Sequence, residues 1–250
     1  MSCSLPPEIL DFIIDLLRDE PTTLNACCVV SKSWIQRTRK HLFVDIKFHP
    51  PGRRVCRWRE TFPDPLDSPA HHTQILSIRN PQLITGADTG TIRTFCGVER
   101  LTVDTDLWHD QWVSLTPLRG FSSVLRSLHL SFTSLPDSEV FGLICSLPLL
   151  EDLALVSRSR RRGGGWNTPS TSPKLTGSLE LRMVEGIHSA TYRLLDLPNG
   201  LHFTKIAVAW VSKEDAMSTM YLVSRCSNTL ESLDIANHLW SMFPSVPTLG

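Results

Sequence analysis

The sequence predicts an α/β protein in which a small helical unit precedes an irregular solenoid of short parallel strands with helical returns. Three observations predict this class. A short apolar motif returns at a nearly constant spacing through most of the chain, apolar residues near the N-terminus crowd one predicted helix, and a proline-rich stretch separates the two patterns. The 250 residues are enough for a small module joined to a larger domain.

The composition is that of an ordinary globular protein and argues against several function classes. Hydrophobic residues make up 41% of the chain and charged residues 20%, and the formal net charge is zero. No overall charge therefore draws the protein to nucleic acid or to an anionic membrane. The longest uninterrupted apolar run, Ile206–Val211, has six residues and is too short to cross a bilayer. We expect no nucleic-acid partner and no membrane association.

Seven cysteines without a C-x-x-C pair predict a reducing compartment, the cytosol or the nucleus. His71 and His72 form the one histidine cluster, and adjacent side chains of an extended segment point in opposite directions, so we expect no metal site. No P-loop, dinucleotide glycine fingerprint, nucleophile elbow or H-E-x-x-H motif occurs. The sequence thus predicts no enzyme activity, no cofactor and no catalytic residues.

The N-terminal region predicts a helix that begins at a proline pair. Proline costs little at the first helical position, and Glu8 follows in the first turn, where negative charge is favoured. Most residues from Ile9 to Leu17 are apolar and cover more than the single stripe that seats a helix on its own core. The excess indicates that this helix also meets a partner.

The same region contains Leu-Pro-x-Glu-Ile at 5–9, Val30-Ser-Lys-x-Trp34 and a closing Leu42-Phe43, in that order. It closely resembles the F-box, which docks proteins onto the Skp adaptor of cullin-based ubiquitin ligases. An ordinary helical hairpin is the alternative. The resemblance implies an F-box at 1–48 whose adaptor-binding residues are Leu5, Pro6, Glu8, Ile9, Val30 and Trp34. It places in the F-box core Leu10, Ile13, Ile14, Leu17 and Leu42. Residues 21–23 lengthen the junction after the first helix, where we expect a loop.

Residues 49–72 predict a proline-rich, semi-rigid linker. Within it we expect a short helix around Arg57–Phe62. Just before it, residues 44–48 alternate as a strand and are expected to start the solenoid.

From residue 73 to residue 250 the pattern apolar-x-x-apolar-x-apolar predicts a degenerate repeat domain. Its two closely spaced apolar residues point inward from a strand, and the residue between them points outward. We expect helical returns between the strands, best marked at 212–225 and 137–146. The middle apolar residues recur every 25 to 27 positions: Leu76, Leu101, Leu128, Leu153, Leu179, Ile206 and Leu233.

This pattern resembles the leucine-rich repeats of F-box proteins, particularly the divergent fungal-type family. The Asn or Cys usual after the strand is replaced by Thr133, Arg158, Val184 and His238, so we expect an irregular solenoid. A non-repetitive α+β domain is the alternative. The resemblance implies a concave target-binding surface, for which the candidates are Thr102, His129, Ala154, Glu180, Ala207 and Asp234.

Residues 158–173 replace one return with an arginine-, glycine- and proline-rich insertion that we expect to be mobile. The composition of this insertion is compatible with a solvated loop and, as alternatives, with a nuclear-import patch, an anion-binding loop or a segment that is phosphorylated. No capping repeat is evident at 241–250, which indicates a truncated product or a partner over that edge. Four further tryptophans are expected either to pack in the core or at its edge, or to anchor a recruited protein: Trp108, Trp112, Trp210 and Trp240.

Together the two resemblances imply a non-enzymatic substrate receptor of a Skp–cullin–F-box ubiquitin ligase complex, in the ubiquitin-conjugation pathway. The F-box would bind a Skp-family adaptor and through it a cullin, and the solenoid would bind a target protein that the sequence does not identify. Ubiquitin transfer would be accelerated by proximity. The alternatives are an F-box and leucine-rich-repeat interaction scaffold outside ubiquitination, and a hydrolase or transferase without a recognisable motif.

Overall fold

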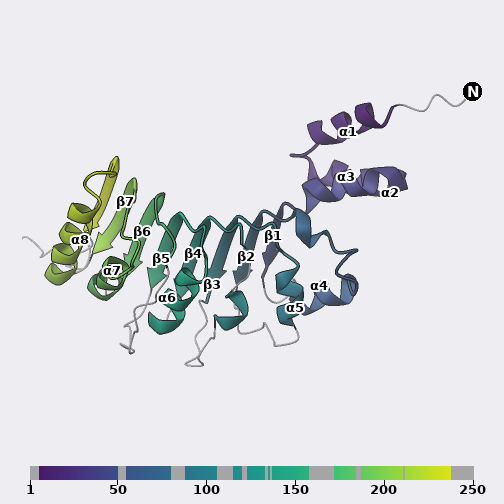
Figure 1. Ribbon diagram of the computed structural model, residues 1–250. Coiled ribbons are helices and arrows are strands. Elements are labelled where there is room, and N and C mark those ends of the chain that lie inside the picture. Colours follow the sequence, from purple (N-terminus) through teal and green to yellow (C-terminus); the bar gives the residue numbers. More distant parts are fainter. Residues whose placement is uncertain are drawn as a thin grey trace, which may run out of the picture.

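The computed structural model describes residues 6–49, 55–79, 88–105, 115–119, 123–132, 135, 137–157, 172–183, 187–210 and 212–237. In this described part, eight parallel strands form one sheet in the order β1 to β8, so each strand lies beside its neighbour in sequence. Helices line one face of the sheet and leave the other face open, and α1 to α3 lie together at the N-terminal end (Figure 1). The predicted α/β class with a run of short parallel strands is confirmed.

The described helices alternate with the strands along most of the chain. The α-helices are α1 (Pro7–Leu16), α2 (Pro21–Val30), α3 (Lys32–Leu42), α4 (Val55–Thr61), α5 (Thr89–Arg93), α6 (Asp137–Cys145), α7 (Ile187–Leu195) and α8 (Lys213–Arg225). The 3₁₀ helices are η1 (Pro69–His72) and η4 (Thr116–Leu118). The strands are β1 (Asp45–Phe48), β2 (Ile75–Arg79), β3 (Arg100–Asp104), β4 (Ser127–Phe132), β5 (Asp152–Ser157), β6 (Ser178–Met183), β7 (Lys205–Trp210) and β8 (Ser232–Asn237).

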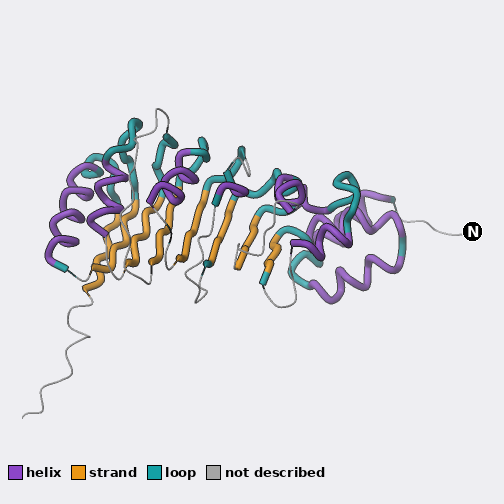
Figure 2. Tube along the Cα trace, turned by 90° about the horizontal axis from the view of Figure 1, so that it is seen from below, coloured by secondary structure: helices purple, strands orange, loops and turns teal. Residues whose placement is uncertain are grey.

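The two closely spaced apolar residues of every repeat motif lie on a strand, and the strands stack in register. Parallel neighbours need a crossover of a dozen or more residues, which the 25- to 27-residue interval supplies. Figure 2 shows the strands side by side with the helices along one face. The predicted middle residues form one continuous ladder across the sheet: Leu76, Leu101, Leu128, Leu153, Leu179, Ile206 and Leu233.

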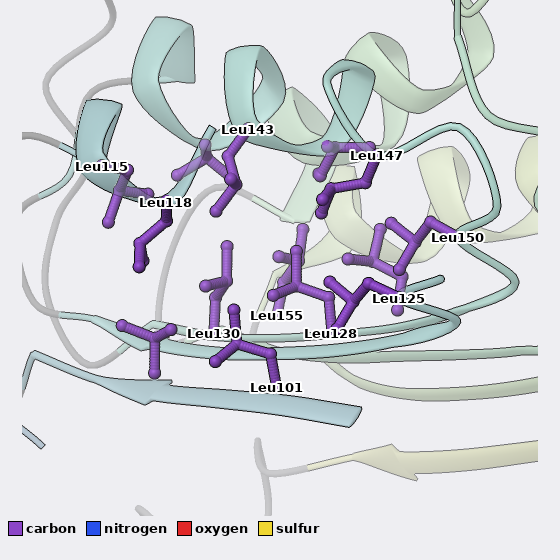
Figure 3. Packing of buried hydrophobic residues seen from close by; sticks show 14 of the residues in the cluster. Leu101, Leu115, Leu118, Leu125, Leu128, Leu130, Leu143, Leu147, Leu150 and Leu155 are labelled. Atoms are coloured by element: carbon purple, nitrogen blue, oxygen red, sulfur yellow. The ribbon is translucent and has the colours of Figure 1, made fainter. Parts of the chain in front are cut away.

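The core lies between the sheet and its returns. In Figure 3, Leu128 and Leu130 of β4 point toward Leu143 of α6 and Leu147 just after it, and each of the four is at most 1% exposed. Burying one such side chain contributes about 1.5–3 kcal/mol. Since each unit buries its apolar side chains chiefly against its neighbours, stability is shared along the stack.

The return between β7 and β8 begins as the sequence predicts. The amide N–H of Asp215 donates to Ser212 Oγ at 3.1 Å, and the amide N–H of Ser212 donates to Asp215 Oδ2 at 3.2 Å. This reciprocal capping box satisfies two N–H groups that the helix itself leaves without a partner. The predicted starts of α8 and α6 are both confirmed.

The described residues 55–72 of the predicted linker pack against the first strands of the sheet. The ring of Trp58 on α4 lies 5.9 Å from Phe48 of β1 and 5.3 Å from Phe95, centroid to centroid. Val55 and Ala70 are buried in the same core. The aromatic and apolar side chains of this segment therefore cover the N-terminal end of the core.

Two local expectations are wrong. Pro21 is the first residue of α2, so residues 21–23 are helical and not a loop; proline at that position gives up no helical hydrogen bond. His71 and His72 lie in the 3₁₀ helix η1 and not in an extended segment, and their ring centroids are 3.9 Å apart. Ser68 starts that turn, since its Oγ accepts from the amide of Ala70 at 3.3 Å.

β8 is the last described strand, and its inward-facing residues Leu233 and Ile235 are 44% and 40% exposed. Among the described residues, none of the helices has the length and apolar character that a membrane crossing requires. Several sequence expectations fall outside the described residues or side chains: Leu5, Trp108, Trp112, Thr133, residues 158–171, Val184, the side chain of Trp210, and residues 238–250.

Candidate partner-binding surfaces

We call residues 7–42 the head. It consists of α1, α2 and α3, and both α1 and α2 pack on α3. Ile14 of α1 and Leu24 and Cys27 of α2 are its buried apolar residues. A unit with so few buried side chains has little core of its own.

Helix α1 carries two apolar stripes. Leu10, Ile14 and Leu17 are spaced for one face of a helix, and Ile14 is 1% exposed while the other two are half-buried. Ile13 was assigned to this core, and that assignment is wrong. By its spacing Ile13 belongs to a second stripe that points away from the core. The members of this outer stripe are Ile9 (47% exposed), Phe12 (61%), Ile13 (39%) and Leu16 (68%).

α1 is attached to α3 by one charged cluster. Asp15 of α1 accepts from Arg37 Nε at 2.6 Å, pairs with the same guanidinium through its second oxygen, and lies 2.7 Å from His41 Nε2. The hydrogen bonds from Arg37, and after them the bond to His41, hold the pKa of the Asp15 carboxyl well below its usual range. The carboxylate thus stays charged and fixes the rotation of α1 about its axis.

Replacing Asp15 with asparagine is expected to lower amide-exchange protection across α1, a loss of about 1 kcal/mol for a pair partly open to solvent. Because the pKa of Asp15 is lowered in the folded chain, its stabilisation is complete above the unfolded value, about 4, and declines as the pH falls below it. Hydrogen exchange of wild type and Asp15→Asn at pH 7 and pH 3 measures both effects. Asp19→Asn, at an exposed position, is the control. Equal protection of α1 in wild type and Asp15→Asn at pH 7 would contradict this role.

The predicted adaptor-binding residues occupy all three helices of the head. Pro6 is the N-cap of α1, and Glu8 and Ile9 are exposed in its first turn. Val30, at the end of α2, is 66% exposed, and Trp34 of α3 is half-buried. Sequence reasoning missed the exposed residues Phe12, Leu16 and Val29, although the spacing of the first two at i+3 and i+7 from Ile9 would have identified the outer stripe.

The predicted target-binding residues form one row across the open face of the sheet. Each is paired directly with the next: Thr102, His129, Ala154, Glu180, Ala207 and Asp234. All are half-buried except Asp234, which is exposed. The register extends this row to Ser77 and Lys47, which the repeat motif does not mark.

Two ion pairs lie on the open face. Arg79 lies 3.3 Å from Asp104, and Arg182 lies 2.5 Å from Glu180. His129 and Glu180 stand two strands apart, about 10 Å, so they cannot act on one proton. The face thus carries charges of both signs.

Among the described residues, no group of three or more His, Cys, Asp or Glu side chains could hold a metal ion. Burial raises the pKa of Cys145 to about 11, and burial also raises the pKa of Cys226. Both thiols therefore stay protonated near neutral pH and are weak nucleophiles.

Comparison with known proteins adds no relative from which function could be transferred. No protein-family model matches the chain, and no curated protein sequence matches it significantly.

Proposed function

We propose that this protein is an F-box substrate receptor of a Skp–cullin–F-box ubiquitin ligase, with the head bound to the Skp-family adaptor and the leucine-rich-repeat-like solenoid bound to a target protein. The proposal rests on the sequence resemblance of residues 5–48 to the F-box and on the surfaces described above. Its cullin contact would be indirect, through the adaptor.

The observation that carries the proposal is the outer stripe of α1. Exposed apolar residues at i, i+3, i+4 and i+7 form a second face that the head does not bury: Ile9, Phe12, Ile13 and Leu16. Val29 and Val30 at the end of α2 are 86% and 66% exposed and add to the apolar surface of the head. Contiguous exposed apolar area on a small helical unit is typical of a protein interface.

The junction between head and sheet supports the same proposal. A receptor has to hold its target at a fixed distance from the conjugating enzyme, because positioning converts a bimolecular transfer into an effectively unimolecular one. Phe43, which follows α3, packs edge-to-face on Trp58 at 5.6 Å, and Trp58 in turn packs on the sheet core. The head is thereby joined to the sheet by aromatic packing.

Co-expression with a Skp-family adaptor and a cullin tests the proposal. Wild type is expected to co-purify with both. Ile9→Asp and Val30→Asp place a charge on exposed positions of the head and are expected to weaken recovery at least about tenfold, since truncation or disruption of central interface residues costs about 2 kcal/mol or more. Met220→Asp is the matched control, because Met220 of α8 is 67% exposed and far along the chain from the head.

The receptor proposal would be contradicted if the adaptor were absent from purified wild type, or if Ile9→Asp and Val30→Asp recovered as much adaptor as wild type does. Reconstitution with the conjugating enzyme separates it from the interaction scaffold. A receptor leads to ubiquitin on itself or on a bound protein, whereas the scaffold binds adaptor without any ubiquitin transfer.

A further inference from the structure

A groove of about 650 Å³ lies at the junction between the head and the sheet. Its walls are the first part of α2, with Pro21 and Asn25, and the outer side of α4. The rest of its lining is formed by all four residues of β1, by Leu42, and by the aromatic residues Phe43, Trp58 and Phe62. No part of the function proposed above uses this groove.

The groove runs along an open sheet edge. β1 is the first strand of the sheet, so its outer side has no strand beside it in the described part of the chain. In a parallel ladder, alternate residues direct both main-chain groups to the same neighbour. Val44 O accepts from the amides of Gln74 and Ile75, so by alternation Asp45 and Lys47 direct their main-chain groups outward. These groups are a template for one more strand.

Beside that edge lie half-buried aromatic rings. Phe62 and Trp58 on the α4 side have centroids 4.9 Å apart, and Phe43 lies 6.3 Å from Phe62. All three line the groove and retain exposed surface. An apolar side chain entering between α2 and α4 would cover these rings, and burial of such a side chain favours binding.

The charged side chains of the groove indicate the sign of the charge that its occupant carries. Its charged lining residues are Asp45, Lys47 and Arg57. Lys47 Nζ lies 3.1 Å from an Asp45 oxygen, so these two neutralise each other. Arg57 is exposed, and no described carboxylate forms an ion pair with it. The groove therefore carries one uncompensated positive charge that complements a carboxylate on the occupant.

We propose that this groove binds an extended, acidic peptide segment of a partner protein, which adds a strand to the outer edge of β1. Main-chain hydrogen bonds to β1 give the affinity, an apolar side chain covers Trp58 and Phe62, and a carboxylate of the segment pairs with Arg57. This site lies apart from the outer stripe of α1 and shares only Lys47 with the extended target-binding row, and its existence does not depend on adaptor binding.

Selection of displayed random peptides, about ten residues long to span one short strand, tests the site with the full chain as bait. Peptides enriched on wild type are then synthesised, and their dissociation constants are measured with three variants. Arg57→Glu reverses the unpaired charge. Asn25→Trp fills the groove from an exposed position on α2. Lys213→Glu, at an exposed position on α8, makes the same charge change outside the groove.

The enriched peptides are expected to share an acidic residue beside an apolar one. Arg57→Glu and Asn25→Trp should each weaken their binding at least about tenfold, a loss within the range measured for close charge pairs, while Lys213→Glu leaves it unchanged. Each of the two alternating sets of peptide amides is also N-methylated in turn; methylation of the set that faces β1 should abolish binding, and methylation of the other set should leave it largely intact. No enrichment on wild type, binding indifferent to Asn25→Trp, or full binding by both N-methylated sets would each overturn the proposal. Adaptor recovery is not read in this experiment, so its failure and that of the receptor proposal are separable.

Discussion

Phe95→Ala is expected to lower the free energy of unfolding by about 3–5 kcal/mol, the usual cost of emptying a fully buried phenylalanine site. Phe95 is 0% exposed and packs on Phe48 of β1 at 5.8 Å and on Trp58 of α4 at 5.3 Å, centroid to centroid. The substitution removes the aromatic ring that packs between α4 and β1. The damage should concentrate at this end of the sheet, because stacked units depend mainly on their neighbours.

Urea unfolding together with amide exchange of β1 and β2 measures this effect. Phe12→Ala is the matched control: the same substitution at a side chain that is 61% exposed should change stability by no more than about 0.5 kcal/mol. Similar losses for both variants would show that the junction is not packed as described.

Arg59→Leu is expected to cost about 1–3 kcal/mol, because it removes a cationic partner of a buried carboxylate, while Arg59 itself is 40% exposed. Arg59 Nη1 lies 3.0 Å from Asp88 Oδ1, and the Asp88 side chain is 1% exposed. The pair ties α4 to the start of α5. Removing both charges in Arg59→Leu/Asp88→Leu should restore part of the loss, since a buried ion pair is worth little against apolar residues of similar volume.

The control for this prediction is Arg126→Leu. Arg126 pairs with Glu151, but the two side chains are 53% and 40% exposed, so its removal should cost less than about 1 kcal/mol. Denaturant unfolding of the four proteins decides the matter. A cost for Arg59→Leu no larger than for Arg126→Leu would contradict the buried-pair account.

The sheet could be predicted because its determinants are local and repeated. One inward leucine or isoleucine per repeat, from Leu76 to Leu233, fixes both the strand positions and their register. The start of α8 could be predicted because Ser212 and Asp215 form their capping box within four residues of chain. The target-binding row follows from the same register, although its use in binding stays a prediction.

The junction could not be predicted because its partners are far apart in sequence. Trp58 meets Phe43, Phe48 and Phe95, which lie on separate elements, and no periodicity connects them. Residues 21–23 were mispredicted for a different reason. Proline breaks helix interiors, so it was taken as the mark of a loop, but Pro21 stands at the first position of α2, where proline is tolerated. Ile13 was assigned to the wrong stripe because a helix that is apolar nearly all round does not reveal its rotation.

Titration calorimetry with the purified adaptor of the same organism measures most directly whether the outer stripe of α1 binds a Skp-family adaptor. Wild type and Met217→Asp/Met220→Asp, a control at exposed positions of α8, are predicted to bind alike. Phe12→Asp/Leu16→Asp should raise the dissociation constant at least about 30-fold, which corresponds to a loss of about 2 kcal/mol in binding free energy. No heat of binding with wild type, or an unchanged dissociation constant for Phe12→Asp/Leu16→Asp, would contradict binding through this stripe.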